Sequence, residues 1–148
     1  MIENFGFGTS MTLGEGIQKL RELESENDMT NRMPVEIKQV FEQHDAVHIL
    51  FGCGTSIQDE IAAHIWMLLA TTAKISEMHL AVASQEHRNV LSSIGHLKLI
   101  GIWLVCLPRI VGIIFKSLRM KKRLAVEELA VLKEQSILEI RREHGIVL

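Results

Sequence analysis

Apolar residues recur along this chain at the spacing of a helix. Between residues 13 and 23 a leucine or isoleucine returns every three or four positions, which is the pattern of a short amphipathic helix. The polar stretch 24–33 separates it from a second apolar pattern, and Pro34 is well placed to open a helix that we expect to reach about Phe51. No segment sustains the alternation of a half-buried strand, so the pattern predicts an all-α fold.

A glycine-containing turn follows the second helix. Gly52 and Gly54 interrupt the helical pattern, and Ser56 is suited to cap the next helix, with Asp59 completing a capping box. Because residues 57–82 contain neither glycine nor proline, we expect the third helix to cover that whole range.

The last third of the chain adds an apolar stretch and a final amphipathic helix. Residues 99–115 carry a single charge, Arg109, and Pro108 should kink or end a helix there. A last helix is predicted over residues 125–142, with Gly145 as a suitable stop.

Length and composition limit the remaining possibilities. The 148 residues suffice for one compact domain, which we expect to consist of an N-terminal arm and short helix (1–33) and a multi-helix domain (34–148). Apolar residues make up 47% of the chain, so some apolar surface is expected to serve a ligand or a membrane. The net charge of -2 argues against nucleic acid as a partner. Two distant cysteines and no secretory signal indicate a cytoplasmic location.

Four residues around the glycine turn have the chemistry and spacing of metal ligands. His44 and His48 lie one helical turn apart, and Asp45 precedes His48 by three residues, so all three can approach one point. The turn then brings Glu60 back across the helix. The stripe that holds both histidines also holds Phe41, so the imidazoles should face inward, where polar groups need partners.

A divalent cation would satisfy these four side chains at once. Their mixed nitrogen and oxygen donors suit Zn²⁺ best, with Mn²⁺ and Fe²⁺ also allowed. The alternative is a hydrogen-bonded network between two helices without an ion. His64, one turn after Glu60, is a candidate catalytic proton carrier or further ligand, and otherwise an ordinary helix histidine.

The run from His44 to Glu60, HDAVHILFGCGTSIQDE, resembles the HDxxHx11E signature of the coenzyme Q biosynthesis protein 4 family. Gly52 and Thr55 match the turn of that family, and the run IRREHGI (140–146) is similar to its closing helix. The resemblance extends from about Pro34 to the C-terminus.

This resemblance implies an all-α protein of ubiquinone biosynthesis, peripheral to a membrane. It implies a metal held by His44, Asp45, His48 and Glu60, beside an apolar groove for a polyprenyl tail. That family is credited with organising other quinone-biosynthesis proteins, and with decarboxylation and hydroxylation at C1 of a prenylated benzoate ring. Whether this chain is an enzyme or a non-enzymatic scaffold the sequence leaves open.

The apolar stretch 99–115 is the expected lipid-binding element. It is interpreted as a buried or prenyl-lining helix, an interfacial membrane helix or a true span, in that order of preference. The basic residues after it either contact anionic headgroups or form a solvated loop. A homodimer is the oligomer expected from base rates. The side chains expected to contact lipid are Leu99, Ile102, Trp103, Cys106, Ile110, Ile113 and Ile114.

Overall fold

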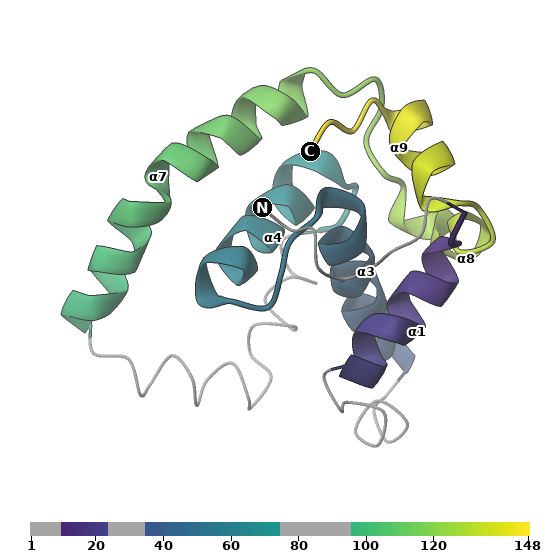
Figure 1. Cartoon of the computed structure of the whole chain (residues 1–148), viewed down its shortest axis with the longest axis horizontal. Helices are drawn as coiled ribbons and strands as arrows, with labels where there is room; N and C mark the ends of the chain where they lie inside the picture. Colours follow the sequence, from purple (N-terminus) through teal and green to yellow (C-terminus); the bar gives the residue numbers. More distant parts are fainter. Residues whose placement is uncertain (1–9, 24–34, 75–95) are drawn as a thin grey trace.

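Helices dominate the described part of the chain, which in this computed structural model comprises residues 10–23, 35–74 and 96–148 (Figure 1). Strand pairing in those ranges is limited to two isolated bridges, so the predicted all-α fold is confirmed. The helices are α1 (Leu13–Leu23), α3 (Val35–Phe51), α4 (Ile57–Ala70), α7 (His96–Leu118), the 3-10 turn η1 (Val126–Glu128), α8 (Leu129–Leu132) and α9 (Ile137–His144).

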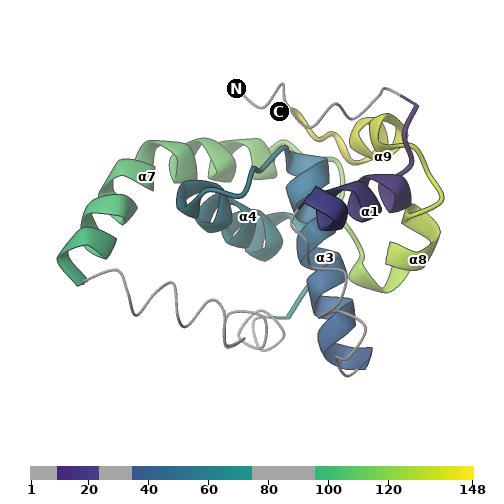
Figure 2. The same ribbon diagram turned by 60° about the horizontal axis from the view of Figure 1, so that its bottom comes forward.

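α3 is the central helix. It lies between α4 on one side and α1 on the other, and α7 covers the far side of α4 (Figure 2). Every residue from 44 to 51 is buried, and five of these eight residues, at 46–47 and 49–51, are apolar. Both α1 and α4 pack on α3. The candidate ligands His44 and His48 therefore lie in the interior because neighbouring helices cover this half of α3.

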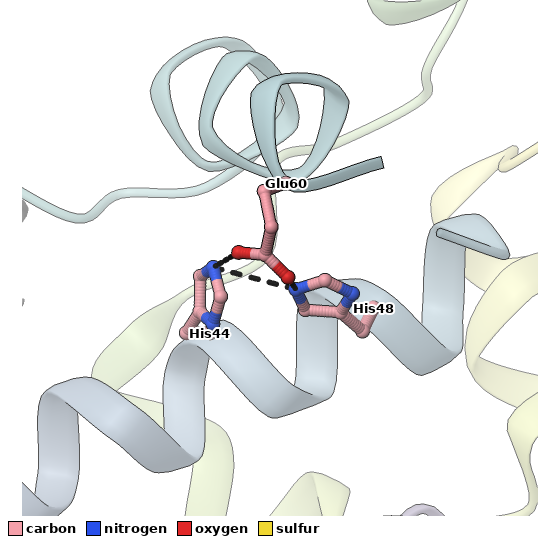
Figure 3. Close-up of side chains that lie close together, drawn as sticks. All are labelled: His44, His48 and Glu60. Atoms are coloured by element: carbon pink, nitrogen blue, oxygen red, sulfur yellow. Dashed lines mark hydrogen bonds and ion pairs between the residues drawn. The ribbon is translucent and has the colours of Figure 1, made fainter. Parts of the chain in front are cut away.

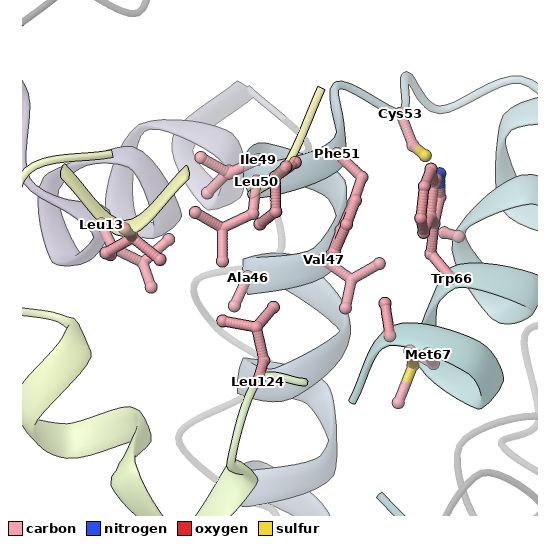
Figure 4. Packing of buried hydrophobic residues seen from close by; sticks show 14 of the residues in the cluster. Leu13, Ala46, Val47, Ile49, Leu50, Phe51, Cys53, Trp66, Met67 and Leu124 are labelled. Carbon is pink, nitrogen blue, oxygen red and sulfur yellow. The ribbon is translucent and has the colours of Figure 1, made fainter. Parts of the chain in front are cut away.

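The core is continuous from α1 across α3 to α4. Leu13 and Ile49 are among its fully buried side chains, and on the other side of α3 Phe51 stacks on Trp66 of α4, with ring centroids 4.2 Å apart (Figure 4). Offset aromatic pairs of this kind add to the gain from apolar burial. This contact fixes the position of α4, which carries Glu60, against the helix that carries the histidines.

The turn between α3 and α4 is built as the sequence predicts. Gly52 has a φ of +63°, and the N–H of Cys53 donates to the carbonyl of His48 at 2.9 Å, which is the closing bond of a Schellman motif. Ser56 caps α4 by accepting from the N–H of Asp59, and its hydroxyl donates to the Asp59 carboxylate at 2.7 Å. Two well-formed helix ends thus set a short, defined path from His48 to Glu60.

Replacing Gly52 by alanine is expected to destabilise the fold by about 1 kcal/mol, because an L side chain is strained at positive φ. The matched control is Gly112→Ala in α7, where an added Cβ meets nothing within 4 Å. That change should be neutral or stabilise by up to about 1 kcal/mol. Urea denaturation of both variants checks this; equal effects would contradict the role given to Gly52.

α7 continues through Pro108 and curves along α4 (Figure 1). The residues expected to contact lipid divide between its two sides. Cys106 and Ile113 are buried against the core, Ile102 and Ile110 are half-buried, Trp103 and Ile114 are exposed, and the side chain of Leu99 lies outside the described ones. By length and composition the segment Ile100–Leu118 is also able to cross a membrane, and only 11% of it is buried.

α4 is shorter than predicted. It ends at Ala70, and Thr71 is extended and forms a parallel bridge with Leu124. The N–H of Leu124 donates to the Ala70 carbonyl at 2.8 Å. A residue distant in sequence thus provides the hydrogen bond for a carbonyl that has no partner within the helix. The predicted continuation to residue 74 is therefore wrong, and residues 75–82 lie outside the described ones.

The single helix predicted over 125–142 is wrong as well. The chain forms η1 and α8, leaves the helix after Leu132, and starts α9 with Ser136 as its N-cap. Tertiary hydrogen bonds explain the break, because the carbonyls of Lys133 and Gln135 accept from the first two N–H groups of α1. The predicted stop at Gly145 is confirmed, with a φ of +70°.

Candidate metal centre

Three of the four predicted ligands converge between α3 and α4. Nε2 of His44 and Nε2 of His48 lie 3.4 Å apart, and the Glu60 carboxylate straddles them (Figure 3). Its Oε1 is 3.3 Å from His48 Nε2 and its Oε2 is 3.4 Å from His44 Nε2. Among the described residues these three form the group of side chains able to hold a metal ion.

These separations are close to those between the ligands of one metal ion. Donor atoms bound at about 2.05 Å to a tetrahedral zinc lie about 3.3 Å from one another. The contacts of 3.3 and 3.4 Å between Glu60 and the two histidines are made by different oxygens of the carboxylate. One donor atom from each of the three residues lies within 4.8 Å of the others, so these side chains are close enough to share a small divalent cation.

A hydrogen bond on the far side of the His48 ring leaves Nε2 as an acceptor that faces Glu60. Nδ1 of His48 lies 3.2 Å from the carbonyl oxygen of Cys53, to which it can only donate. That bond puts the ring proton on Nδ1 and turns the lone pair of Nε2 toward Glu60. A metal-bound histidine usually donates the N–H of its other ring nitrogen to a carbonyl or carboxylate in this way. A lone pair facing a carboxylate needs a proton or a cation between them.

Burial and charge agree with this description. His44 and His48 are 9% and 4% exposed. Burial alone would lower the pKa of His48, but its hydrogen bond and charge interaction with Glu60 outweigh that and raise the pKa above 6.5. The pocket thus favours a positive charge at this nitrogen, which a proton supplies in the metal-free protein and a metal ion can replace.

Asp45, the fourth predicted ligand, lies outside the group. Its Oδ2 accepts from Nε of Arg21 in α1 at 2.7 Å. Asp45 is rotated by about 100° around α3 from His44, so its carboxylate can reach α1, which packs on α3. The expectation that it joins the histidines fails in this geometry, because a buried arginine provides a stronger partner than the sequence spacing could show.

His64 lies beside the three-residue group. Its Nδ1 is 2.7 Å from the carbonyl of Glu60, and its ring centroid is 5.0 Å from that of His44. The hydrogen bond to the preceding turn is a common one for a helix histidine. The prediction that His64 is a proton carrier or ligand stays a prediction.

Cys53 is not suited to bind the ion or attack a substrate. It is 2% exposed, and burial raises the pKa of its thiol to about 12. The thiolate is the form that binds metals and acts as a nucleophile. Cys53 is therefore a packed core residue.

Two further residues, Asp59 and Arg109, hold the first turn of α4, which carries Glu60. Arg109 of α7 donates from Nη2 to Oδ1 of Asp59 at 2.7 Å, and Asp59 is the residue before Glu60. Burial works against the charge of Asp59, but hydrogen bonds from Ser56 and Arg109 lower its pKa below the ordinary value. The capping motif at Ser56 signalled Asp59, whereas no local pattern signals Arg109.

The raised pKa of His48 predicts opposite pH dependences with and without metal. In the metal-free protein the His48–Glu60 contact contributes stability that is full below pH 6.5 and is lost as the pH rises through the folded-state pKa. Metal binding requires the unprotonated ring and so strengthens over the same rise. Thermal melts between pH 6 and 8 should show the zinc-dependent gain in melting temperature growing with pH; a constant gain would count against His48 as a ligand.

The fold and the site define the chain as an all-α protein with a candidate divalent-metal centre of two imidazoles and one carboxylate. Comparison with family models, with curated proteins and with solved structures gives no match.

Proposed function

We propose that this chain is a divalent-metal protein of quinone or prenyl-lipid metabolism, similar to the coenzyme Q biosynthesis protein 4 family. The observation that carries the proposal is the convergence of His44, His48 and Glu60, whose donor atoms, one from each residue, lie within 4.8 Å of one another. Such an ion would act as a Lewis acid on a ring phenolate or carboxylate. Two histidines and one glutamate leave coordination positions for solvent or substrate, as in catalytic sites.

Zn²⁺ is the metal we favour, with Mn²⁺ and Fe²⁺ as alternatives. The mixed nitrogen and oxygen donors of the group suit zinc, and zinc enzymes use this His₂Glu set. The same donors also suit Fe²⁺ in sites with two histidines and one carboxylate. Elemental analysis of protein purified without added metal distinguishes the three.

α7 supports an association with lipid. Its outward side, which we name the α7 apolar face, is formed by Ile100, Trp103, Leu104, Val105, Leu107, Val111, Ile114, Phe115 and Leu118, each 41–76% exposed. A contiguous apolar surface of this kind on a soluble protein marks a binding surface. We propose that it lies in the surface of a membrane, so that the chain is a peripheral protein on the cytoplasmic side.

The charges around α7 favour an anionic bilayer over a second copy of the chain. From residue 96 to 126 the chain has no acidic residue and seven basic ones, Lys98, Arg109, Lys116, Arg119, Lys121, Lys122 and Arg123. Two such faces brought together would place like charges near each other, which disfavours the pairing. Each basic residue near an anionic membrane surface contributes about 1 kcal/mol of attraction.

A cosedimentation experiment tests the membrane surface. The wild-type chain should sediment with vesicles of phosphatidylcholine and phosphatidylglycerol, and less with phosphatidylcholine alone. Val105→Asp, on the α7 apolar face at 73% exposure, should abolish the binding. Val131→Asp, at a valine 65% exposed on α8, is the control and should bind as wild type. Equal loss in both variants, or a dimer formed through α7 in place of vesicle binding, would refute the proposal.

The enzymatic form of the proposal is tested separately from the carrier form. With a prenylated hydroxybenzoate as substrate, turnover by the wild type that is abolished in His48→Ala supports C1 decarboxylation or hydroxylation at the metal. An inactive wild type that retains prenyl lipid supports a non-enzymatic scaffold for quinone-biosynthesis enzymes. A protein that binds neither metal nor prenyl lipid would be a small membrane-associated protein whose histidine motif is incidental, and the proposal would fall.

A further inference from the structure

Asp45 has two possible partners, the candidate metal centre and Arg21. Along α3 it lies between the ligands His44 and His48, yet its carboxylate is paired with Arg21. Asp45 is buried and Arg21 is largely buried, with side-chain exposures of 8% and 13%. α1, which carries Arg21, packs directly on α3. The pair is thus part of the core and not a contact between mobile surface groups.

The Asp45 carboxylate is the counter-charge of the Arg21 guanidinium. Its Nε donates to Asp45, and within the described part of the chain its buried Nη2 has no hydrogen-bond partner. If Asp45 turned to a metal ion, the guanidinium would stay buried without its counter-charge, which is a costly arrangement. The arginine therefore holds Asp45 away from the three-residue group.

We propose that Arg21 sets the coordination of the metal centre by withholding Asp45, so that the ion has three protein ligands and an open position for an anionic oxygen ligand. The inference rests on the proposed metal centre. A divalent ion with one glutamate and two neutral imidazoles carries a net charge of +1, whereas a bound aspartate would cancel that charge. The open position then attracts a monoanion such as a carboxylate or a phenolate.

Cobalt binding by the purified chain tests the ligand count, with visible absorption as the readout. Asp45→Asn should change the Co²⁺ affinity by no more than about twofold, as expected for a residue outside the coordination sphere. Glu60→Gln should weaken it by about 100-fold or more. If Asp45→Asn weakens binding as much as Glu60→Gln does, Asp45 is a ligand and the proposal is overturned.

Releasing Asp45 tests the role of Arg21. Arg21→Gln should tighten Co²⁺ binding by about tenfold, because the freed carboxylate becomes a fourth ligand. The double variant Arg21→Gln/Asp45→Asn should return to wild-type affinity, and it remains informative if Asp45→Asn alone fails to fold. The matched control is Lys133→Gln, which frees Glu42 from a similar ion pair one turn earlier on α3 and should have no effect. Unchanged affinity in Arg21→Gln would overturn the proposal.

Binding of acetate to the Co²⁺ ion tests directly whether a coordination position is open, which Co²⁺ affinity alone does not show. Added to the Co²⁺-loaded wild type, it should shift the visible spectrum, and in Arg21→Gln the shift should need about tenfold more acetate. Absence of any acetate effect on the wild type would contradict an open position. A wild type that binds no Co²⁺ at all would instead remove the proposed function, so the two failures are distinguishable.

Discussion

Replacing His48 by alanine lowers the affinity of this chain for Zn²⁺ by about 100-fold or more, the largest effect on binding that we expect from a single change. His48 contributes the nitrogen closest to Glu60, and it is the ligand whose orientation a backbone carbonyl fixes. Removing it leaves one imidazole and one carboxylate, which is too few for a tight site. Competition with a chromogenic chelator measures the change.

His144→Gln is the control for this experiment. His144 is as deeply buried as His48, at 2% exposure, and its Nδ1 donates to the carbonyl of Ile140 in α9. Its replacement should reduce stability and leave zinc affinity unchanged, because it lies outside the three-residue group. A parallel loss of zinc in both variants would mean that general loosening of the fold, and not a missing ligand, explains the result.

Arg141→Ala is expected to destabilise the chain by about 3 kcal/mol, the largest effect on stability that we predict from a polar side chain. Arg141 of α9 donates from Nε to the carbonyl of Leu50 at 2.8 Å and from Nη2 to that of Ile49 at 2.7 Å. These carbonyls lie in the buried last turn of α3, where water cannot replace the lost donor. Without the guanidinium, two buried acceptors lose a charged partner.

The neighbouring residue gives a matched comparison. Arg142 is exposed, and Arg142→Ala should change the free energy of unfolding by no more than about 0.5 kcal/mol. Urea denaturation with linear extrapolation measures both. Because α3 carries the two histidines, Arg141→Ala should also weaken zinc binding modestly. Similar unfolding free energies for the two variants would refute the capping role of Arg141.

The sequence predicts best where the determinants are local. The helical spacing of His44 and His48, the turn at Gly52 and the cap at Ser56 together place Glu60 opposite the imidazoles. Each of these signals lies within a few residues of the structure it specifies. Three of the four predicted ligands are consequently found together.

Partners distant in sequence account for what could not be predicted. Asp45 has the spacing of a ligand, but Arg21 lies 24 residues earlier on another helix, and no pattern announces their contact. The break before α9 has the same origin, since the carbonyls of Lys133 and Gln135 bond to the start of α1. A local signal for that break does exist, because Ser136 and Glu139 have the spacing of a helix N-cap.

The central claim is that His44, His48 and Glu60 bind one divalent ion. X-ray absorption at the metal edge, on the wild-type chain loaded with zinc and washed free of excess, tests it most directly. Elemental analysis of the same sample should give one zinc ion per chain. The spectrum should show two imidazole nitrogens around the ion, with oxygen atoms of the carboxylate and of solvent in the remaining positions. Protein that retains no zinc after washing, or an ion with no imidazole around it, would contradict the account.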